Sequence, residues 1–583
     1  MKQILTTVWK TDKKNFLLII FLNIISAMTS SVSIVMLIPM LDVMDISVGT
    51  GSTLGILLQP FQGMTATQRA IVIISAFVGL MLFKAALTAI TSIRQNIFME
   101  RYEMRLRAQV YDAISTADWE ILSAKRRSDL TQLIINQCGQ TRSCLHKIVS
   151  LISSIFSVLL QLALALWMSI PVTLVVLAVG ISLLFLFRPL VKKSKAYGKK
   201  SIAVTREVYR EIQNQLNSIK EIRAYGVREH NAKRFEEYSK KSYNIHLKMA
   251  QLHVTPKTCY SIASAALIAL AFVVSQLMGM GTAQLVVLIY IFSRLWPVFS
   301  SWQGQWQSIQ SSMPAFETIR ESLEELQCGT QEPELQGEAM KFTESITFKD
   351  LCFAYKNGSE EVLHNINFEL PCGSVTALVG PSGAGKSTTA DLLLGLLRPT
   401  KGQILVDGTV LDHENLGAWR KAIGYIPQEP LIINTTIRDN LQRFHPEATE
   451  EEMIDALKRS LAWPFIEKLP EGLDTVLGDK GTRLSGGERQ RIVLARVLLG
   501  KPRFIILDEA TSALDYESES FIRETIRSLR NKTTVLVIAH RMTTIRGADR
   551  AIVIQNGAIT EQGSLQELLD KADSYLAKMD NVE

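Results

Sequence analysis

The sequence predicts an α-helical membrane bundle of six transmembrane helices fused to an α/β domain of the P-loop type. Three observations predict this architecture. The 583-residue chain is 47% hydrophobic, which is high for a soluble protein. Long apolar stretches occupy its first half. From residue 348 onward, short β-branched runs alternate with helical patterns, which predicts a mainly parallel sheet with covering helices. These runs are SVTALVG, QILVDG, FIILDE, TVLVIAH and RAIVIQNG, and the first of them leads into a glycine-rich loop.

Six stretches have roughly the length of a membrane helix, about 20 residues for a hydrocarbon core of about 30 Å. Because a backbone in lipid must satisfy its own hydrogen bonds, we expect each stretch to be helical. The first is too long for a signal peptide, so we expect it to stay in place as a span. The predicted spans are Phe16–Leu41, Ala70–Ile93, Ile148–Ile170, Val172–Val191, Tyr260–Met280 and Ala283–Trp302.

Basic residues are concentrated on one side of this bundle. The connections after the second and fourth spans carry many lysines and arginines, whereas the opposite connections contain only Arg69. The positive-inside rule places the basic connections, both termini and the α/β domain in the cytoplasm, and we expect a multi-pass protein of a cell inner (cytoplasmic) membrane. This topology accounts for the net charge of +7, so we expect no nucleic-acid partner.

The two basic connections, roughly residues 94–147 and 192–257, have helical polar patterning and almost no glycine or proline. We therefore expect the membrane helices to continue beyond the bilayer. Residues 327–340 lose the apolar pattern and are typical of a linker. The predicted domains are a transmembrane domain (residues 1–325), a linker (326–345) and a nucleotide-binding domain (346–583).

The segment GPSGAGKS matches the full pattern of a phosphate-binding P-loop, and an apolar strand-like run precedes it. Its glycines let the backbone approach phosphates, and the N-terminus of the next helix favours an anion. Lys386 adds a positive charge for the β and γ phosphates, and the Ser387 hydroxyl can ligate Mg²⁺. We therefore predict that ATP and Mg²⁺ bind here. The predicted ATP-binding residues of the loop are Gly380, Pro381, Ser382, Gly383, Ala384, Gly385, Lys386, Ser387 and Thr388.

Two other apolar runs end in polar residues. FIILDE ends in Asp508, expected in the Mg²⁺ shell, and Glu509, expected to polarise the attacking water as a general base. An acidic strand end that only caps a helix is the alternative. TVLVIAH ends in His540, and we expect this residue at the ligand crevice formed by the carboxyl ends of parallel strands, although a lone histidine is more often structural.

A second anion-binding pattern, LSGGE, offers a serine hydroxyl, two glycines and a helix N-terminus at Leu484–Glu488. A phosphoryl-transfer site needs charge stabilisation on every side of the γ phosphate, and one P-loop leaves a side open to water. If LSGGE cannot fold back onto its own P-loop, it must close the site of a second copy. The sequence leaves both arrangements open.

In order and spacing, these motifs resemble those of ABC transporter nucleotide-binding domains. Gly380–Ser387 resembles the Walker A loop, Leu484–Glu488 the signature, Asp508–Glu509 the Walker B motif and His540 the H-loop. The resemblance implies that two such domains bind head to tail and enclose two ATP molecules. Because Glu509, His540 and the signature are all intact, we expect a homodimer with two competent sites; a heterodimer with one degenerate site is the alternative. The residues that resemble the in-trans signature are Leu484, Ser485, Gly486, Gly487 and Glu488, and those that resemble the D-loop are Ser512, Ala513, Leu514 and Asp515.

The same resemblance assigns two further positions and shows one departure. Tyr355 resembles the aromatic residue that stacks on adenine, and Gln428 resembles the glutamine that contacts Mg²⁺ and the attacking water. Asp479 stands where exporters usually carry an acidic GE pair, a shortening expected to matter little. The expected catalytic residues are Glu509, His540 and Gln428, and the expected Mg²⁺ ligands are Ser387, Gln428 and Asp508.

Six spans with two long cytoplasmic connections resemble the exporter-type ABC half-transporter. The resemblance implies a short coupling helix near Ala117–Lys125 and another near Ser218–Tyr225, which would dock on the ATPase domain. Trp119 is the expected docking anchor and Glu221 belongs to the second helix. Packing of Trp119 within its own helix pair is the alternative.

Three residues of the bundle are candidates for a substrate cavity. A charge in hydrocarbon is costly unless it faces a cavity or a partner. Lys84 lies within the second predicted span and Arg294 within the sixth, so both are candidates. The alternative is that these side chains snorkel to the membrane interface. Trp296 lies in WPVFSSWQGQWQ with Trp302 and Trp306. These tryptophans are typical of an interfacial belt, but the interleaved glutamines also suit an amphipathic ligand.

The resemblance therefore implies an ATP-driven exporter that works by alternating access. Its substrate would be amphipathic or hydrophobic: a peptide, natural product, siderophore-like metabolite or drug. A flippase for lipids or lipid-linked molecules would share every ATPase residue and is the alternative. A non-transporting ATPase, such as a gated channel or sensor, is a third class. The expected partners are a second copy of the chain, the lipid bilayer and the substrate.

Overall fold

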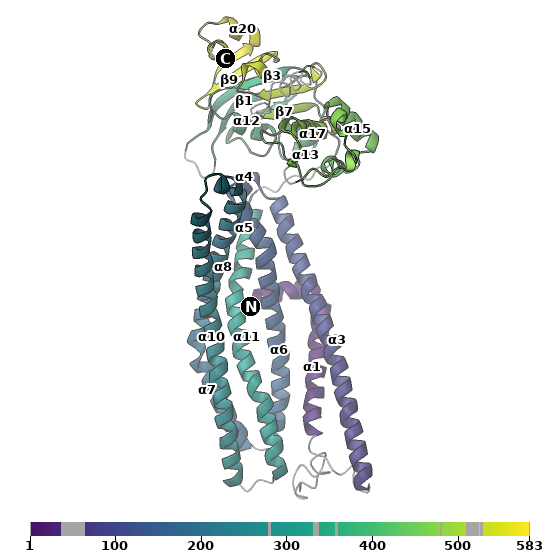
Figure 1. The fold of residues 1–583 in the computed structure, drawn as a ribbon, viewed down its shortest axis with the longest axis vertical. Helices are drawn as coiled ribbons and strands as arrows, with labels where there is room; N and C mark the ends of the chain where they lie inside the picture. The colour runs from purple at the N-terminus through teal and green to yellow at the C-terminus, as the bar shows by residue number, and fades with distance from the viewer. Residues whose placement is uncertain are drawn as a thin grey trace. The chain divides into compact units, whose positions relative to one another are not determined.

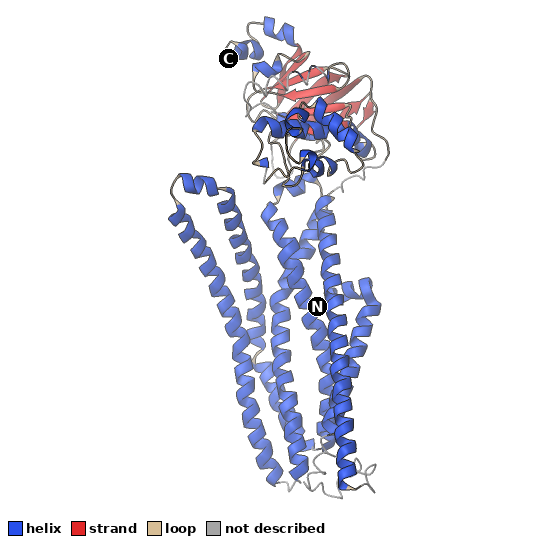
Figure 2. Cartoon of the chain, turned by 45° about the vertical axis from the view of Figure 1, so that its right-hand side comes forward, coloured by secondary structure: helices blue, strands red, loops and turns tan. Residues whose placement is uncertain are grey.

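The computed structural model describes residues 2–36, 65–168, 170–277, 282–329, 337–355, 360–478, 481–508, 524, 527 and 529–581. The chain divides into two compact units. One comprises Met1–Ser115 and Lys125–Cys328, the other Thr116–Ala124 and Gly329–Glu583. The first is helical, and the strands belong to the second (Figure 2). The predicted fold class, a helical membrane bundle fused to an α/β domain, is confirmed.

Long helices run side by side through the first unit (Figure 1). Four stretches within the described residues are long and apolar enough to cross a membrane: Asp12–Ser30, Thr67–Ser115, Arg127–Trp167 and Thr173–Asn217. They overlap the first four predicted spans, although residues 37–41 of the first lie outside the described residues. The sixth predicted span lies in α11, and the fifth lies in α10 up to Leu277; its last residues, 278–280, are also outside the described part of the chain. The long helices are α1 (Lys2–Val35), α3 (Ala66–Ser115), α6 (Cys138–Met168), α7 (Ile170–Leu186), α8 (Arg188–Asn217), α10 (Arg228–Leu277) and α11 (Thr282–Gln327).

Both long basic connections are helical, as predicted. α3 continues beyond the predicted span to Ser115, and α8 and α10 form most of the second connection. Short helices lie near both predicted coupling positions, because α4 and α9 occupy residues inside the two expected ranges. These shorter elements are α4 (Trp119–Ala124), α5 (Arg127–Gln132), the π-helix η2 (Leu133–Gln137) and α9 (Ile219–Ala224).

The helix α11 is central to the first unit, where it packs against α6, α8 and α10. Its backbone approaches that of α8 closely at Gly198. A Cβ atom added to Gly198 would lie 2.9 Å from the Cα of Ser311 and closer still to the carbonyl oxygen of Ser311. The absence of a side chain at Gly198 therefore allows the two helix backbones to touch.

Replacing Gly198 by Ala is expected to destabilise the protein by about 1–3 kcal/mol, because the added methyl group forces two backbones apart. Gly79→Ala in α3 is the matched control: a Cβ there meets nothing within 4 Å, and alanine favours a helix over glycine. The thermal unfolding midpoint of each variant, reconstituted in lipid nanodiscs, measures the difference. Equal midpoints for the two variants would contradict this account of Gly198.

The second unit contains two sheets. One has four strands in the order β2-β1-β4-β5, and the other has six in the order β10-β9-β3-β8-β7-β6. In the larger sheet β9, β3, β8, β7 and β6 pair in parallel, and β10 pairs antiparallel at one edge. The strands are β1 (Ser345–Phe353), β2 (Leu363–Pro371), β3 (Val375–Val379), β4 (Lys401–Val406), β5 (Thr409–Val410), β6 (Ile423–Ile426), β7 (Phe504–Asp508), β8 (Thr534–Ile538), β9 (Arg550–Gln555) and β10 (Ala558–Ser564).

The run QILVDG was expected in the mainly parallel sheet, and this expectation was wrong. Its strand β4 pairs antiparallel with β1. Burial explains the difference: every residue of β3 is buried, as in a strand covered on both faces, whereas buried residues recur only at alternate positions near the end of β4.

Helices flank and cap these sheets. α12 follows β3 directly, and α14 to α17 lie between β6 and β7 in the chain. The helices of this unit are α12 (Lys386–Leu393), α13 (Leu416–Ala422), α14 (Ile437–Gln442), α15 (Glu450–Arg459), α16 (Trp463–Ile466), the 3-10 helix η3 (Gly472–Asp474), α17 (Gly486–Leu499), α19 (Met542–Ile545), α20 (Leu565–Asp570) and α21 (Tyr575–Asp580).

Candidate nucleotide site

The predicted P-loop connects the buried strand β3 to the N-terminus of α12. Gly380 has φ 154° and Gly385, which caps α12, has φ 103°. A Cβ at Gly380 would collide with the carbonyl oxygen of Ile554 on β9, and one at Gly385 would lie 2.5 Å from Leu363 Cδ2. Only glycine fits both positions, so the sequence pattern and the loop geometry agree.

Lys386 places its charge inside this loop. Its ammonium Nζ donates hydrogen bonds of 2.9 Å to the carbonyl oxygens of Gly380 and Pro381, and the residue is only 6% exposed. The next residue, Ser387, is exposed in the first turn of α12. A helix N-terminus, a buried cation and an exposed hydroxyl together suit a polyphosphate with its metal ion.

Strand register brings four of the predicted residues to one edge of the sheet. Leu378 of β3 pairs with Ile538 of β8, which pairs with Asp508 of β7. Gly380 follows Leu378 by two residues and His540 follows Ile538 by two residues, so both lie at the same end of the sheet. On the other side, Ile426 of β6 pairs with Leu507 of β7, so that Gln428 follows β6 at this edge as well. The edge is the ligand crevice expected for parallel strands.

Two residues that the sequence analysis missed lie beside Asp508. The hydroxyl of Tyr425 donates a 3.3 Å hydrogen bond to Asp508 Oδ2. Burial, and then the charge of Asp508, raise the pKa of Asp391 on α12 to about 6. Burial and the charge of Asp508 also raise the pKa of the Tyr425 hydroxyl. Negative charge is therefore concentrated at this point, which favours a divalent cation.

The oxygen donors at this edge fit Mg²⁺. Asp508 supplies a carboxylate and Ser387 a hydroxyl, both hard ligands of the kind that Mg²⁺ prefers. Within the described residues, no group of three or more His, Cys, Asp or Glu could hold a metal ion by itself.

Tyr355 lies beside the P-loop helix. Its hydroxyl is 3.3 Å from Thr388 Oγ1, and its ring meets Phe353 edge-on with 4.9 Å between the centroids. The residue is 38% exposed. A fixed, partly exposed ring next to the loop is suited to stack on a nucleobase.

The signature motif begins the helix α17, and Ser485 is its N-cap. The amide of Glu488 donates to Ser485 Oγ at 3.2 Å, while Glu488 Oε2 accepts from the amide and the hydroxyl of Ser485, each at 2.8 Å. This reciprocal capping box fixes the exposed end of the helix. The N-terminus of α17 is thus ordered without a ligand.

Buried and bridging arginines hold the helices around α17. Arg496 of α17 is 7% exposed and donates to Asn440 of α14 and to the carbonyl of Leu431. Burial lowers the pKa of this guanidinium to about 10. The sequence analysis did not identify Arg496, and its only signal was a charge in an otherwise apolar part of α17.

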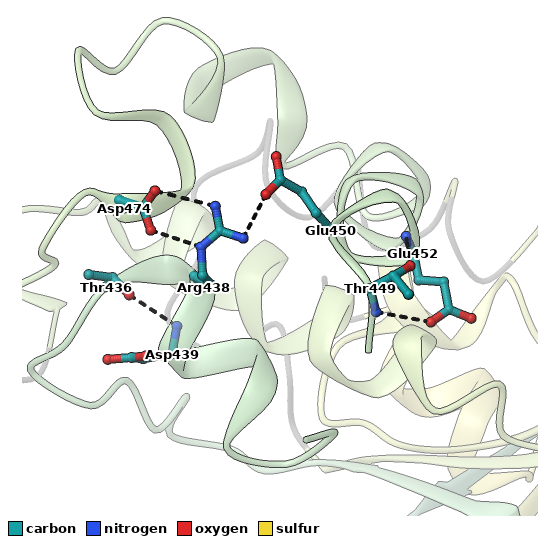
Figure 3. A network of polar contacts seen from close by, with 7 residues as sticks. All are labelled: Thr436, Arg438, Asp439, Thr449, Glu450, Glu452 and Asp474. Atoms are coloured by element: carbon teal, nitrogen blue, oxygen red, sulfur yellow. Dashed lines mark hydrogen bonds and ion pairs between the residues drawn. The ribbon is translucent and has the colours of Figure 1, made fainter. Parts of the chain in front are cut away.

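A second arginine, Arg438 of α14, ties this helix to two other segments. It donates to Asp474 and to Glu450, each at 2.8 Å (Figure 3). The capping box of Thr449 and Glu452 begins α15 close to this network. Together these contacts make α14, α15 and α17 one connected support for the signature.

Some predicted residues lie outside the described part of the chain. These are Glu509, Asp479, Ser512, Ala513, Leu514 and Asp515; the side chain of Arg294 is also outside it. Trp119 begins α4 and is 39% exposed, and Glu221 lies exposed in α9. Lys84 is half-buried in α3. Trp296 is buried, donates to the carbonyl of Tyr260 and lines a cavity of about 590 Å³, which Lys84 does not line.

Comparison with known proteins gives one family for both units. The family model described as ABC transporter matches residues 363–512, and the one described as ABC transporter transmembrane region matches residues 16–298. The first match includes the P-loop and strands β3, β6 and β7 of its sheet, and the second covers most of the helical bundle. Each of the two predicted parts of the chain therefore matches a family model of ABC transporters.

Relatives extend this likeness along the chain. The heterocyst differentiation ATP-binding protein HepA of Nostoc sp. is 38% identical over 61% of this chain, which spans 58% of that protein. The chloroplastic ABC transporter B family member 26 of Arabidopsis thaliana is 31% identical over 81% of this chain and 68% of that protein. A solved bacterial Atm1-family ABC exporter with ATP bound has the same fold, with a TM-score of 0.82, 22% identity and 99% of both chains covered. The chain therefore belongs to the ABC transporter family, as an exporter-type half-transporter whose ATPase domain couples ATP hydrolysis to transport.

Proposed function

We propose that the protein is a homodimeric ABC exporter that moves an amphipathic or hydrophobic substrate out of the cytoplasm. It works from a cell inner membrane, with the ATPase domain and both termini in the cytoplasm. ATP and Mg²⁺ bind at the P-loop edge, with Ser387, Gln428 and Asp508 around the metal ion. Glu509 activates the attacking water, and α4 and α9 transmit closure to the bundle.

The observation that carries this proposal is the separation of the two anion-binding loops within one domain. The P-loop follows β3, whereas α17 packs against β6 at the edge of the sheet. Two strands lie between β3 and β6, which amounts to about 14 Å at the usual strand spacing. This supports a head-to-tail dimer in which Ser485 of one subunit closes the site of the other.

A transport assay tests the proposal. Inside-out vesicles that contain the wild type or Glu509→Gln are incubated with cytosolic and lipid extracts of the source cell and with ATP, all added on the outside. Export is expected to enrich a soluble species in the lumen of wild-type vesicles alone, measured by mass spectrometry. Continued ATP hydrolysis with a lipid changing leaflet and no soluble enrichment would favour the flippase, and hydrolysis with neither would indicate a non-transporting ATPase.

A further inference from the structure

A large cavity lies between α6, α7, α8 and α11 at the end of the spans where the basic connections begin. Its volume is about 1280 Å³, which is enough for a sizeable ligand. We call it the basic cavity. Its lining residues are Leu151, Leu184, Arg188, Pro189, Val191, Lys192, Lys195, Ala196, Lys199, Trp302, Gln303, Trp306 and Gln310.

One wall of the basic cavity is cationic. Arg188, Lys192, Lys195 and Lys199 follow one another on α8 at intervals of four, three and four residues, which places them on one face of the helix. None of the described residues that line the cavity is acidic. A one-sign stripe beside a low-dielectric wall attracts an anion strongly.

Part of this positive charge is not neutralised by any described residue. Lys195 forms a 2.7 Å ion pair with Glu317, and Arg188 lies over the ring of Phe185 at 5.1 Å. By contrast, Lys192 and Lys199 are exposed and make no ion pair with any described residue. Two ammonium groups, two helical turns apart, therefore remain available to an acidic group.

The opposite wall is largely apolar and aromatic. Trp302 is held in place because its indole N–H donates to Ser154 Oγ at 2.6 Å, and Trp306 lies one helical turn further along α11. Leu151 and Leu184 extend the apolar surface. Such a wall suits the hydrophobic body of a ligand, whose charged end would meet α8.

A buried amide supplies a second, independent sign of a ligand. Gln303 is 3% exposed and lines the cavity, yet its side-chain Nε2 has no hydrogen-bond partner within the described part of the chain. A buried polar atom without a hydrogen-bond partner destabilises the structure. A ligand oxygen in the cavity would offset this cost.

We propose that the basic cavity binds an amphipathic anion, a molecule with a phosphate, sulfate or carboxylate head and an apolar body. Its head lies between Lys192 and Lys199, and its body lies against Trp302 and Trp306. The role of this anion as cargo rests on the proposed exporter function, whereas the binding site itself does not. An anionic bilayer lipid and a transported metabolite share this chemistry.

Binding of dodecyl phosphate to the full-length protein tests the site. The protein is placed in phosphatidylcholine nanodiscs without nucleotide, and the affinity is measured by calorimetry after subtraction of empty discs. Lys192→Gln/Lys199→Gln is expected to weaken binding at least about tenfold, because each charge-assisted contact is worth about that much. Lys192→Arg/Lys199→Arg keeps the charge and should restore most of the affinity.

Lys193→Gln/Lys200→Gln is the matched control, since it removes two lysines with the same spacing from the same helix, and neither lines the cavity. It should bind like the wild type. Dodecyltrimethylammonium has the same tail and the opposite charge, so Lys192→Gln/Lys199→Gln should bind it no more weakly than the wild type does. Equal affinity of wild type and Lys192→Gln/Lys199→Gln for dodecyl phosphate would overturn the proposal, and so would equal loss in the control.

Repeating the titration in phosphatidylglycerol discs identifies the source of the anion. A bilayer lipid that occupies the site would compete and lower the affinity for dodecyl phosphate at least about tenfold, whereas a site reserved for cargo would keep it; both outcomes support anion binding. Because the titration contains no ATP, its result is independent of the vesicle assay. If the vesicle assay shows no export but dodecyl phosphate still binds as expected, the exporter proposal is rejected and the anion site stands.

Discussion

Glu509→Gln is expected to lower steady-state ATP hydrolysis by about 10²–10⁴-fold, the range that a general base contributes. The substitution keeps the size of the side chain and removes the group that accepts a proton from water. The hydrogen bonds that Lys386 donates to Gly380 and Pro381 do not involve this side chain, so ATP should remain bound between closed domains. Phosphate release and retained radiolabelled ATP measure the two effects.

The control for this experiment is Glu451→Gln, which makes the same chemical change at an exposed position in the first turn of α15. It should hydrolyse ATP at the wild-type rate. If Glu509→Gln also turned over near that rate, Glu509 would be rejected as the base.

The second large effect is expected from two inactive variants that restore each other. Lys386→Ala removes the buried ammonium of the P-loop, and Ser485→Arg blocks the signature with a large side chain. Each homodimer should lose nearly all hydrolysis, because both of its sites contain one defective half. A mixed dimer should regain one intact site, built from the P-loop of the Ser485→Arg subunit and the signature of the Lys386→Ala subunit.

This recovery distinguishes the two possible arrangements of the loops. If each signature served its own P-loop, both sites of the mixed dimer would remain defective, and no activity would return. Vanadate trapping of one nucleotide per mixed dimer, purified through two different affinity tags, is the measurement. A mixed dimer as inactive as both parents, in trapping and in turnover, would refute the in-trans assignment.

The sequence predicted best those features that consecutive residues encode. GPSGAGKS contains its own loop geometry, since Gly380 and Gly385 adopt backbone angles that only glycine adopts readily. Convergence of Asp508 and His540 was also predictable, because carboxyl ends of parallel strands meet at one edge. The register of β3, β8 and β7 confirms this placement.

Features that depend on contacts between distant segments could not be predicted. Asp391, Tyr425 and Asp508 come from α12, β6 and β7, and no local pattern shows that they meet. The assignment of QILVDG failed for a related reason: a short β-branched run has the same composition in a parallel and an antiparallel sheet. The close backbone contact at Gly198 likewise could not be predicted, because it depends on which part of α11 lies opposite this glycine.

The close approach at Gly198 has a mechanical consequence. Where the two helix backbones touch without an intervening side chain, one helix can tilt about the contact point. Long side chains such as those of the ion pair Lys195–Glu317 can follow this tilt. Arg188 is ten residues, or about 15 Å, from the contact point along α8. A tilt of about 10° would therefore displace the Arg188 end of the basic cavity by about 3 Å, enough to grip or release an alkyl chain.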